Sequence, residues 1–130
     1  MNGSLCLRLL AMLAVAVMIS SCAITSQKVV ENGEEFHYVA TTNPIDTAWC
    51  MGRAAQEMHS LWTPRIRPLN PDGTIEFVVK AVVGLQTTGA VAHLKPIANG
   101  SDVTLWINRE PPIVGRNTLR ERLVGGCSML

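Results

Sequence analysis

Apolar residues recur at spacings of three and four between residues 46 and 61, which is the period of an amphipathic helix. Asp46 is the expected N-cap, because its carboxylate can accept an unpaired backbone amide of the first turn. Pro64 is expected to end the element, since the residue before a proline is biased out of helical geometry. The predicted apolar face contains Met51, Ala54, Ala55, Met58, Leu61 and Trp62.

Much of the remaining chain alternates between apolar and polar positions in short runs, which is the pattern of strands. Residues 70–73, Asn-Pro-Asp-Gly, predict a turn, and residues 99–102 predict a second one. Consecutive short strands with tight connections favour an antiparallel meander over a parallel sheet. The expected strands cover residues 36–40, 65–69, 74–83, 87–95 and 103–107.

A short helix is expected near the end of the chain, where Leu119 and Leu123 lie four residues apart. Asn117 is its expected N-cap, and Gly125 and Gly126 are expected to end it. The predicted fold class is therefore α+β. One main amphipathic helix packs on a four- or five-stranded antiparallel sheet, and a short C-terminal helix follows.

The first residues of the chain have the layout of a secretory signal: a positive start, an apolar centre and a small-residue end. Arg8 precedes an apolar run over residues 9–19, which is followed by two serines and Cys22. The run is about 11 residues long, so at 1.5 Å per residue it falls well short of the roughly 30 Å of a hydrocarbon core. We therefore expect residues 1–21 to be a signal peptide and not a transmembrane helix of the mature protein.

The residues Ile19, Ser20, Ser21 and Cys22 resemble the lipobox of bacterial lipoproteins, in which an aliphatic residue and two small residues precede a cysteine. The resemblance implies that the Cys22 thiol carries diacylglycerol and that the new amino group receives an acyl chain such as palmitate. Several acyl chains make such an anchor durable, because each buried methylene contributes about 0.8 kcal/mol. The alternative is an ordinary secreted protein whose cleavage site happens to be followed by a cysteine.

The resemblance also suggests a location. In Gram-negative lipoproteins an aspartate after the lipidated cysteine commonly signals retention in the inner membrane, and here Ala23 and Ile24 follow instead. The outer membrane is therefore favoured, with the protein facing the periplasm. We expect residues 22–35 to form a lipidated tether and residues 36–130 to form a single small domain, because a chain of this length has room for one core.

The charge balance argues against nucleic acid as a partner. The chain has 11 lysines and arginines against 10 acidic residues, and loss of the signal removes Arg8. The mature protein is then nearly neutral, whereas nucleic-acid binders normally carry a marked cationic excess.

Two of the four cysteines, Cys50 and Cys127, remain after Cys6 in the signal and Cys22 in the lipobox are set aside. A single thiol pair exported to an oxidising compartment is most simply interpreted as a disulfide. Free buried thiols, a metal site and a redox pair are the alternatives. The chain has no Cys-x-x-Cys motif, and two cysteines distant in sequence do not define a zinc site.

The sequence offers little catalytic chemistry. His37, His59 and His93 lie on three different expected elements, and none has a second ligand at short helical spacing. No Gly-x-Ser-x-Gly elbow or phosphate-binding loop is present, so we assign no catalytic residue, metal or cofactor and do not expect an enzyme.

Trp49 is the strongest candidate for a contact residue, because it lies off the apolar stripe of the main helix. We expect a non-enzymatic structural or interaction module of the envelope. Its expected partners are the membrane, through the lipid anchor, and an envelope protein. The alternative is a periplasm-facing domain that binds a ligand or inhibits an enzyme.

Overall fold

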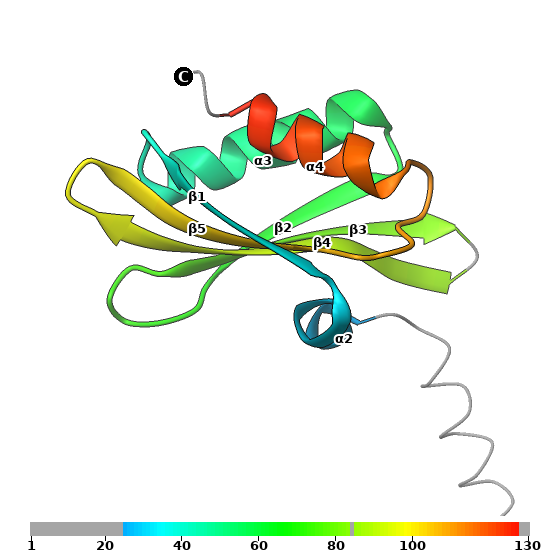
Figure 1. The fold of residues 1–130 in the computed structure, drawn as a ribbon, viewed down its shortest axis with the longest axis horizontal. Coiled ribbons are helices and arrows are strands. Elements are labelled where there is room, and N and C mark those ends of the chain that lie inside the picture. Colours follow the sequence, from blue (N-terminus) through cyan, green and yellow to red (C-terminus); the bar gives the residue numbers. More distant parts are fainter. Residues whose placement is uncertain (1–24, 84, 128–130) are drawn as a thin grey trace, which may run out of the picture.

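The computed structural model describes residues 25–83 and 85–127, and within them a five-stranded antiparallel sheet is covered by helices on both faces (Figure 1). Helices α3 and α4 lie on one face and α2 lies on the other. The α+β prediction is confirmed, with five strands in the sheet. The elements are α2 (Ser26–Asn32), β1 (Glu34–Ala40), α3 (Pro44–Met58), β2 (Trp62–Pro68), β3 (Ile75–Val83), β4 (Leu85–Ile97), β5 (Gly100–Ile107) and α4 (Arg116–Gly125).

The strand order is β1-β5-β4-β3-β2, and every neighbouring pair is antiparallel. Strands β2 to β5 form the expected meander. Helix α3 carries the chain across the sheet from one edge to the other, which leaves the last strand to pair with the first. Strands β1 and β2 are therefore the two edges of the sheet.

Helix α3 begins earlier than the sequence analysis expected. Its N-cap is Asn43, whose side chain accepts a hydrogen bond of 2.9 Å from the amide of Asp46. The assignment of Asp46 as the cap was wrong, because Pro44 fits the first helical position, where a missing N–H costs nothing. The helix also ends earlier, at Met58.

The end of α3 differs from the expectation because residues 62–68 form a strand. Trp62 opens β2 and is 1% exposed, so it belongs to the core as a strand residue. Pro64 lies inside this edge strand. Proline is tolerated there, because its missing N–H does not remove a hydrogen bond from the interior of the sheet.

The core lies between the sheet and the pair α3 and α4. Met51 and Ala55 of α3 and Leu119 and Leu123 of α4 are fully buried there. The sheet contributes apolar residues from the face that these helices cover, among them Trp62, Phe77, Val79, Leu94, Val103, Leu105 and Ile107.

The N-terminal segment differs from the expected tether over residues 22–35. Residues 26–32 form helix α2, capped by Thr25, and β1 begins at Glu34. Val29 of this helix is 2% exposed and clusters with Val78 and Val91 on the sheet face opposite α3. This part of the chain belongs to the folded domain, because it covers apolar residues that would otherwise face water.

A disulfide joins Cys50 of α3 to Cys127, just after α4, with their Cα atoms 5.7 Å apart. This is the pairing expected from the sequence. The N-cap of α4 is Gly115 and not Asn117, and the helix ends at the expected glycines. The disulfide therefore ties together the two helices that cover one face of the sheet.

Candidate functional site

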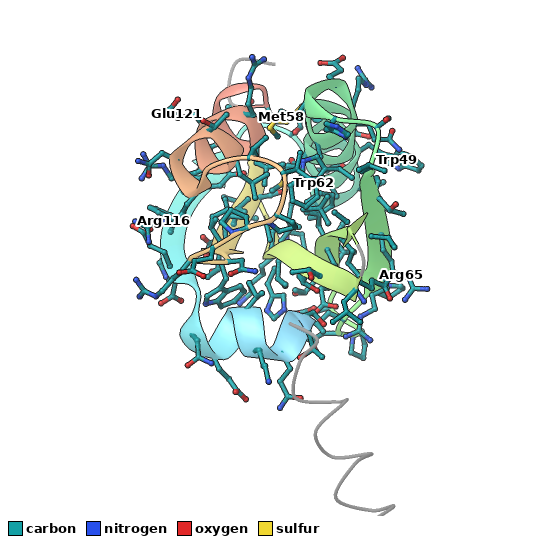
Figure 2. All side chains as sticks on the ribbon, turned by 90° about the vertical axis from the view of Figure 1, so that its right-hand side faces the viewer. Trp49, Met58, Trp62, Arg65, Arg116 and Glu121 are labelled. Carbon is teal, nitrogen blue, oxygen red and sulfur yellow. A yellow bond between two sulfur atoms is a disulfide. The ribbon has the colours of Figure 1, made fainter. Side chains whose placement is uncertain are left out.

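Trp49 is an exposed tryptophan that also lines a groove of the described domain. It is 63% exposed on the outer side of α3, beside β2 (Figure 2). The groove between this helix and this strand has a volume of about 380 Å³. Its lining residues are Trp49, Gly52, Arg53, Gln56, Pro64 and Ile66.

The close approach of α3 to β2 depends on Gly52. A Cβ atom at this position would lie 3.1 Å from the Cβ atom of Pro64, tighter than nine in ten real Cβ contacts. The glycine therefore lets the strand run directly beneath the helix. As a result the indole of Trp49 stands at the rim of a groove with an apolar floor.

The groove combines an exposed aromatic ring with apolar and polar neighbours. Pro64 and Ile66 supply apolar surface, and Arg53 and Gln56 supply hydrogen-bond donors along the helix. Tryptophan and arginine are enriched among the residues that dominate binding energy at protein interfaces. The arrangement can bind a partner, but it brings together no nucleophile, base and charge stabiliser.

A second groove, of about 490 Å³, separates β1 from α4. Phe36 and Tyr38 line it from the strand, and Arg120 and Val124 line it from the helix. The Arg120 guanidinium lies 5.0 Å from the centre of the Phe36 ring, a cation–π contact. Burial raises the pKa of Tyr38 to about 12, so its hydroxyl stays protonated; it donates to Met51 Sδ at 3.8 Å.

A row of polar side chains crosses the whole sheet on the face that α2 partly covers. The strand registers place Arg67, Glu76, His93, Thr104 and His37 directly opposite one another, from edge to edge. Arg67 Nε donates to Glu76 Oε1 at 2.6 Å, and His93 Nε2 lies 3.1 Å from Glu76 Oε2. Thr104 Oγ1 lies 3.2 Å from His37 Nδ1.

Glu76 is the centre of this row and has a side chain only 9% exposed. Burial opposes its ionisation, but the hydrogen bonds from Arg67 and His93 outweigh burial and hold the pKa of the carboxyl below its ordinary value. Both carboxylate oxygens are thus engaged. We interpret the row as a structural ion pair network, because its central charge is fully partnered.

The three histidines do not form one site. His37 and His93 share the row but lie two strands apart, and His59 follows α3, where its Nδ1 accepts a hydrogen bond from the amide of Leu61 at 3.1 Å. Within residues 25–83 and 85–127, no group of three or more histidine, cysteine or acidic side chains could hold a metal ion.

Cys22 and the signal peptide lie outside the described residues. Among the helices of the described part, none is long and apolar enough to cross a membrane.

Trp49 was predicted from the sequence, but the β1–α4 groove and the polar row were not. Both depend on residues far apart in the chain, which only the strand order and registers bring together. No family model matches this chain, and no curated protein matches it either.

Proposed function

We propose that this chain is a lipid-anchored, non-enzymatic module of the bacterial envelope that binds a protein partner through the Trp49 groove. The observation that carries the proposal is the exposed indole of Trp49 at the rim of a formed groove. A partner that covers an exposed tryptophan removes its large apolar surface from water, which favours binding. Such residues are typical interface anchors.

The proposed anchor gives the groove an orientation. Cys22 lies three residues before Thr25, the N-cap of α2, so the intervening chain spans at most about 11 Å. A lipid on Cys22 would therefore hold the α2 face of the sheet near the bilayer. Helix α3 lies on the opposite face, so the Trp49 groove would face away from the membrane (Figures 1 and 2).

The lipid anchor is tested by metabolic labelling with a radioactive fatty acid. Cys22→Ser removes the sulfur atom that would carry the lipid, so the variant should take up no label and should be soluble or remain unprocessed. Cys6→Ser is the matched control, because it removes a cysteine of the signal and leaves the lipobox intact. Equal labelling of wild type and Cys22→Ser would contradict the proposal.

The groove is tested by affinity capture from detergent-solubilised envelope. The wild type should recover a stable protein partner, and Trp49→Ala should lose about 2–4 kcal/mol of binding free energy if the indole is an anchor residue. Leu61→Ala is the control, because Leu61 is an exposed apolar residue, 45% exposed, outside the groove. Equal recovery by Trp49→Ala and by the control would contradict a role for the groove.

A glycan is the second candidate ligand, favoured by the position of Arg53 and Gln56 beside the indole. Sugar rings stack on aromatic faces while planar polar groups bind their hydroxyls. Titration with soluble fragments of envelope glycan, followed by tryptophan fluorescence, distinguishes this case. Quenching that disappears in Trp49→Ala, with no protein captured, would support a glycan over a protein partner.

A further inference from the structure

The two edges of the sheet are protected very differently. Strand β2 contains Pro64 and Pro68, which lack the N–H that an added strand would need. Strand β1, Glu34–Ala40, has seven residues and contains no proline or lysine. Within the described residues no strand pairs with its outer side. Its two acidic residues, Glu34 and Glu35, occupy only its first two positions, so the rest of the edge is open to an added strand.

The sequence of β1 is complementary to itself. When two antiparallel copies overlap over all seven residues, the centre falls on His37, and Phe36 of each copy lies opposite Tyr38 of the other. Aromatic pairs directly opposite each other stabilise antiparallel strands. Glu34 then faces Ala40 and Glu35 faces Val39, so no two acidic side chains are directly opposite.

The groove beside β1 fits the same arrangement. Phe36 and Tyr38 are half-buried on the face toward α4, while the alternate residues His37 and Val39 are exposed on the other face. Pairing of two copies would bring the aromatic residues of both into one continuous apolar strip. The rim of the groove carries one cation, Arg120, and one acid, Glu121, so a two-fold axis there does not concentrate charge of one sign.

We propose that two copies of this chain pair through β1, antiparallel and centred on His37, to form one continuous sheet. The two-fold axis of such a pair is perpendicular to the sheet, because antiparallel strands of one sheet exchange by rotation within its plane. Helix α2 of both copies therefore lies on the same side. Both anchors can enter one bilayer, and this last step alone rests on the proposed lipid at Cys22.

Cysteine cross-linking tests the pairing in the full-length chain in the envelope. His37→Cys places two thiols opposite each other at the centre, with Cβ atoms about 4.5–5.5 Å apart, so mild oxidation should give a covalent dimer on a non-reducing gel. Val39→Cys is the matched control. It lies on the same exposed face, but its two copies would be offset by about 13 Å along the strands, so oxidation should form no covalent dimer and the variant should run as a monomer on the gel.

A second pair of variants checks the register. Glu35→Cys and Val39→Cys, expressed together with different tags, should cross-link to each other, because these positions face each other in the proposed pair. The proposal would be overturned if Val39→Cys alone cross-linked as strongly as His37→Cys. It would also be overturned if neither variant cross-linked. The His37→Cys dimer should persist when Cys22→Ser is added, which separates failure of the pairing from failure of the anchor.

Discussion

Gly89 is a residue whose missing side chain shapes the core. It lies in β4 at the irregularity where the pairing with β3 shifts register between Val79 and Lys80. A Cβ atom at Gly89 would lie 2.6 Å from two ring atoms of Trp62, and the ring is buried among core residues. The indole can therefore occupy its position only because this strand residue has no side chain.

Gly89→Ala should lower the free energy of unfolding by about 1–3 kcal/mol, because the added methyl forces a buried ring to shift in a well-packed core. Urea denaturation followed by tryptophan fluorescence measures the change. Gly125→Ala is the control: it lies in the last turn of α4, and a Cβ atom there would meet no heavy atom within 4 Å. A loss in Gly89→Ala no greater than in Gly125→Ala would contradict the packing argument.

The caps of the helices show what local sequence can and cannot determine. The pattern predicted the position of α3 well, but it selected Asp46 as the cap when Asn43 followed by Pro44 gives a signal of its own. Asp46 instead accepts a hydrogen bond from the Asn43 side chain at 2.9 Å. Two good capping residues three positions apart can both be used, and only the backbone geometry distinguishes the cap from its partner.

At the scale of elements, helix α2 is the largest difference from the sequence prediction. It has seven residues, of which only Val29 is buried, so no helical period can be recognised in it. A signal does exist in the sheet that it covers. Residues 77–79 of β3 are three consecutive buried apolar residues, which indicates that both faces of the sheet are covered, since a half-exposed strand alternates.

Val29→Ala should lower the free energy of unfolding by about 1–2 kcal/mol, because it removes two buried methyl groups from the contact of α2 with the sheet. If residues 26–32 were a free tether, the same change would have no effect. Val82→Ala is the control, since Val82 is 58% exposed on β3. Thermal unfolding followed by circular dichroism compares the two variants.

Glu76 links three strands and predicts a dependence of stability on pH. The hydrogen bonds from Arg67 and His93 hold its pKa in the folded protein below the ordinary value of 4.5. Its ionised form is thus favoured by folding. The corresponding stabilisation is fully present above about pH 4.5 and is lost as the pH falls through the lower folded pKa.

Glu76→Gln should lower stability at pH 7 by about 1–3 kcal/mol, the usual contribution of hydrogen bonds to a charged group, and should flatten the acid part of the profile. The measurement is urea denaturation at a series of pH values from neutral to acidic. Glu57→Gln, an exposed position on α3, should leave the profile of the wild type unchanged. If the stability of Glu76→Gln fell as steeply at acidic pH as that of the wild type, other carboxyl groups would be responsible for the fall.

At the scale of the whole molecule, the sequence predicted the sheet, the helices α3 and α4 and the disulfide better than the surfaces. Strands, turns and the main helix follow from local periodicity, and a single remaining pair of cysteines leaves one intramolecular pairing to consider. The polar row from Arg67 to His37 could not be predicted, because a shift of one residue in any of four strand pairings would break it. Surfaces that depend on register are known only once the sheet is built.

The disulfide closes the fold as a whole, because it joins Cys50 of α3 to Cys127, 77 positions later and just after the end of α4. The change Cys50→Ala with Cys127→Ala should lower the free energy of unfolding by about 2–5 kcal/mol, since the unfolded chain regains the freedom that the long loop removes. The loss should appear first in α4, whose amides should exchange hydrogen faster than those of the central strands.

Two measurements decide whether this stabilisation acts in the exported protein. Wild-type protein treated with a reductant should match the double variant in stability, because both lack the same crosslink. Thiol counting under denaturing, non-reducing conditions should find neither Cys50 nor Cys127 free in protein purified from the envelope. Two free thiols would contradict the crosslink in the cell, and α3 and α4 would then be held together by the packing of Leu119, Leu123 and their neighbours alone.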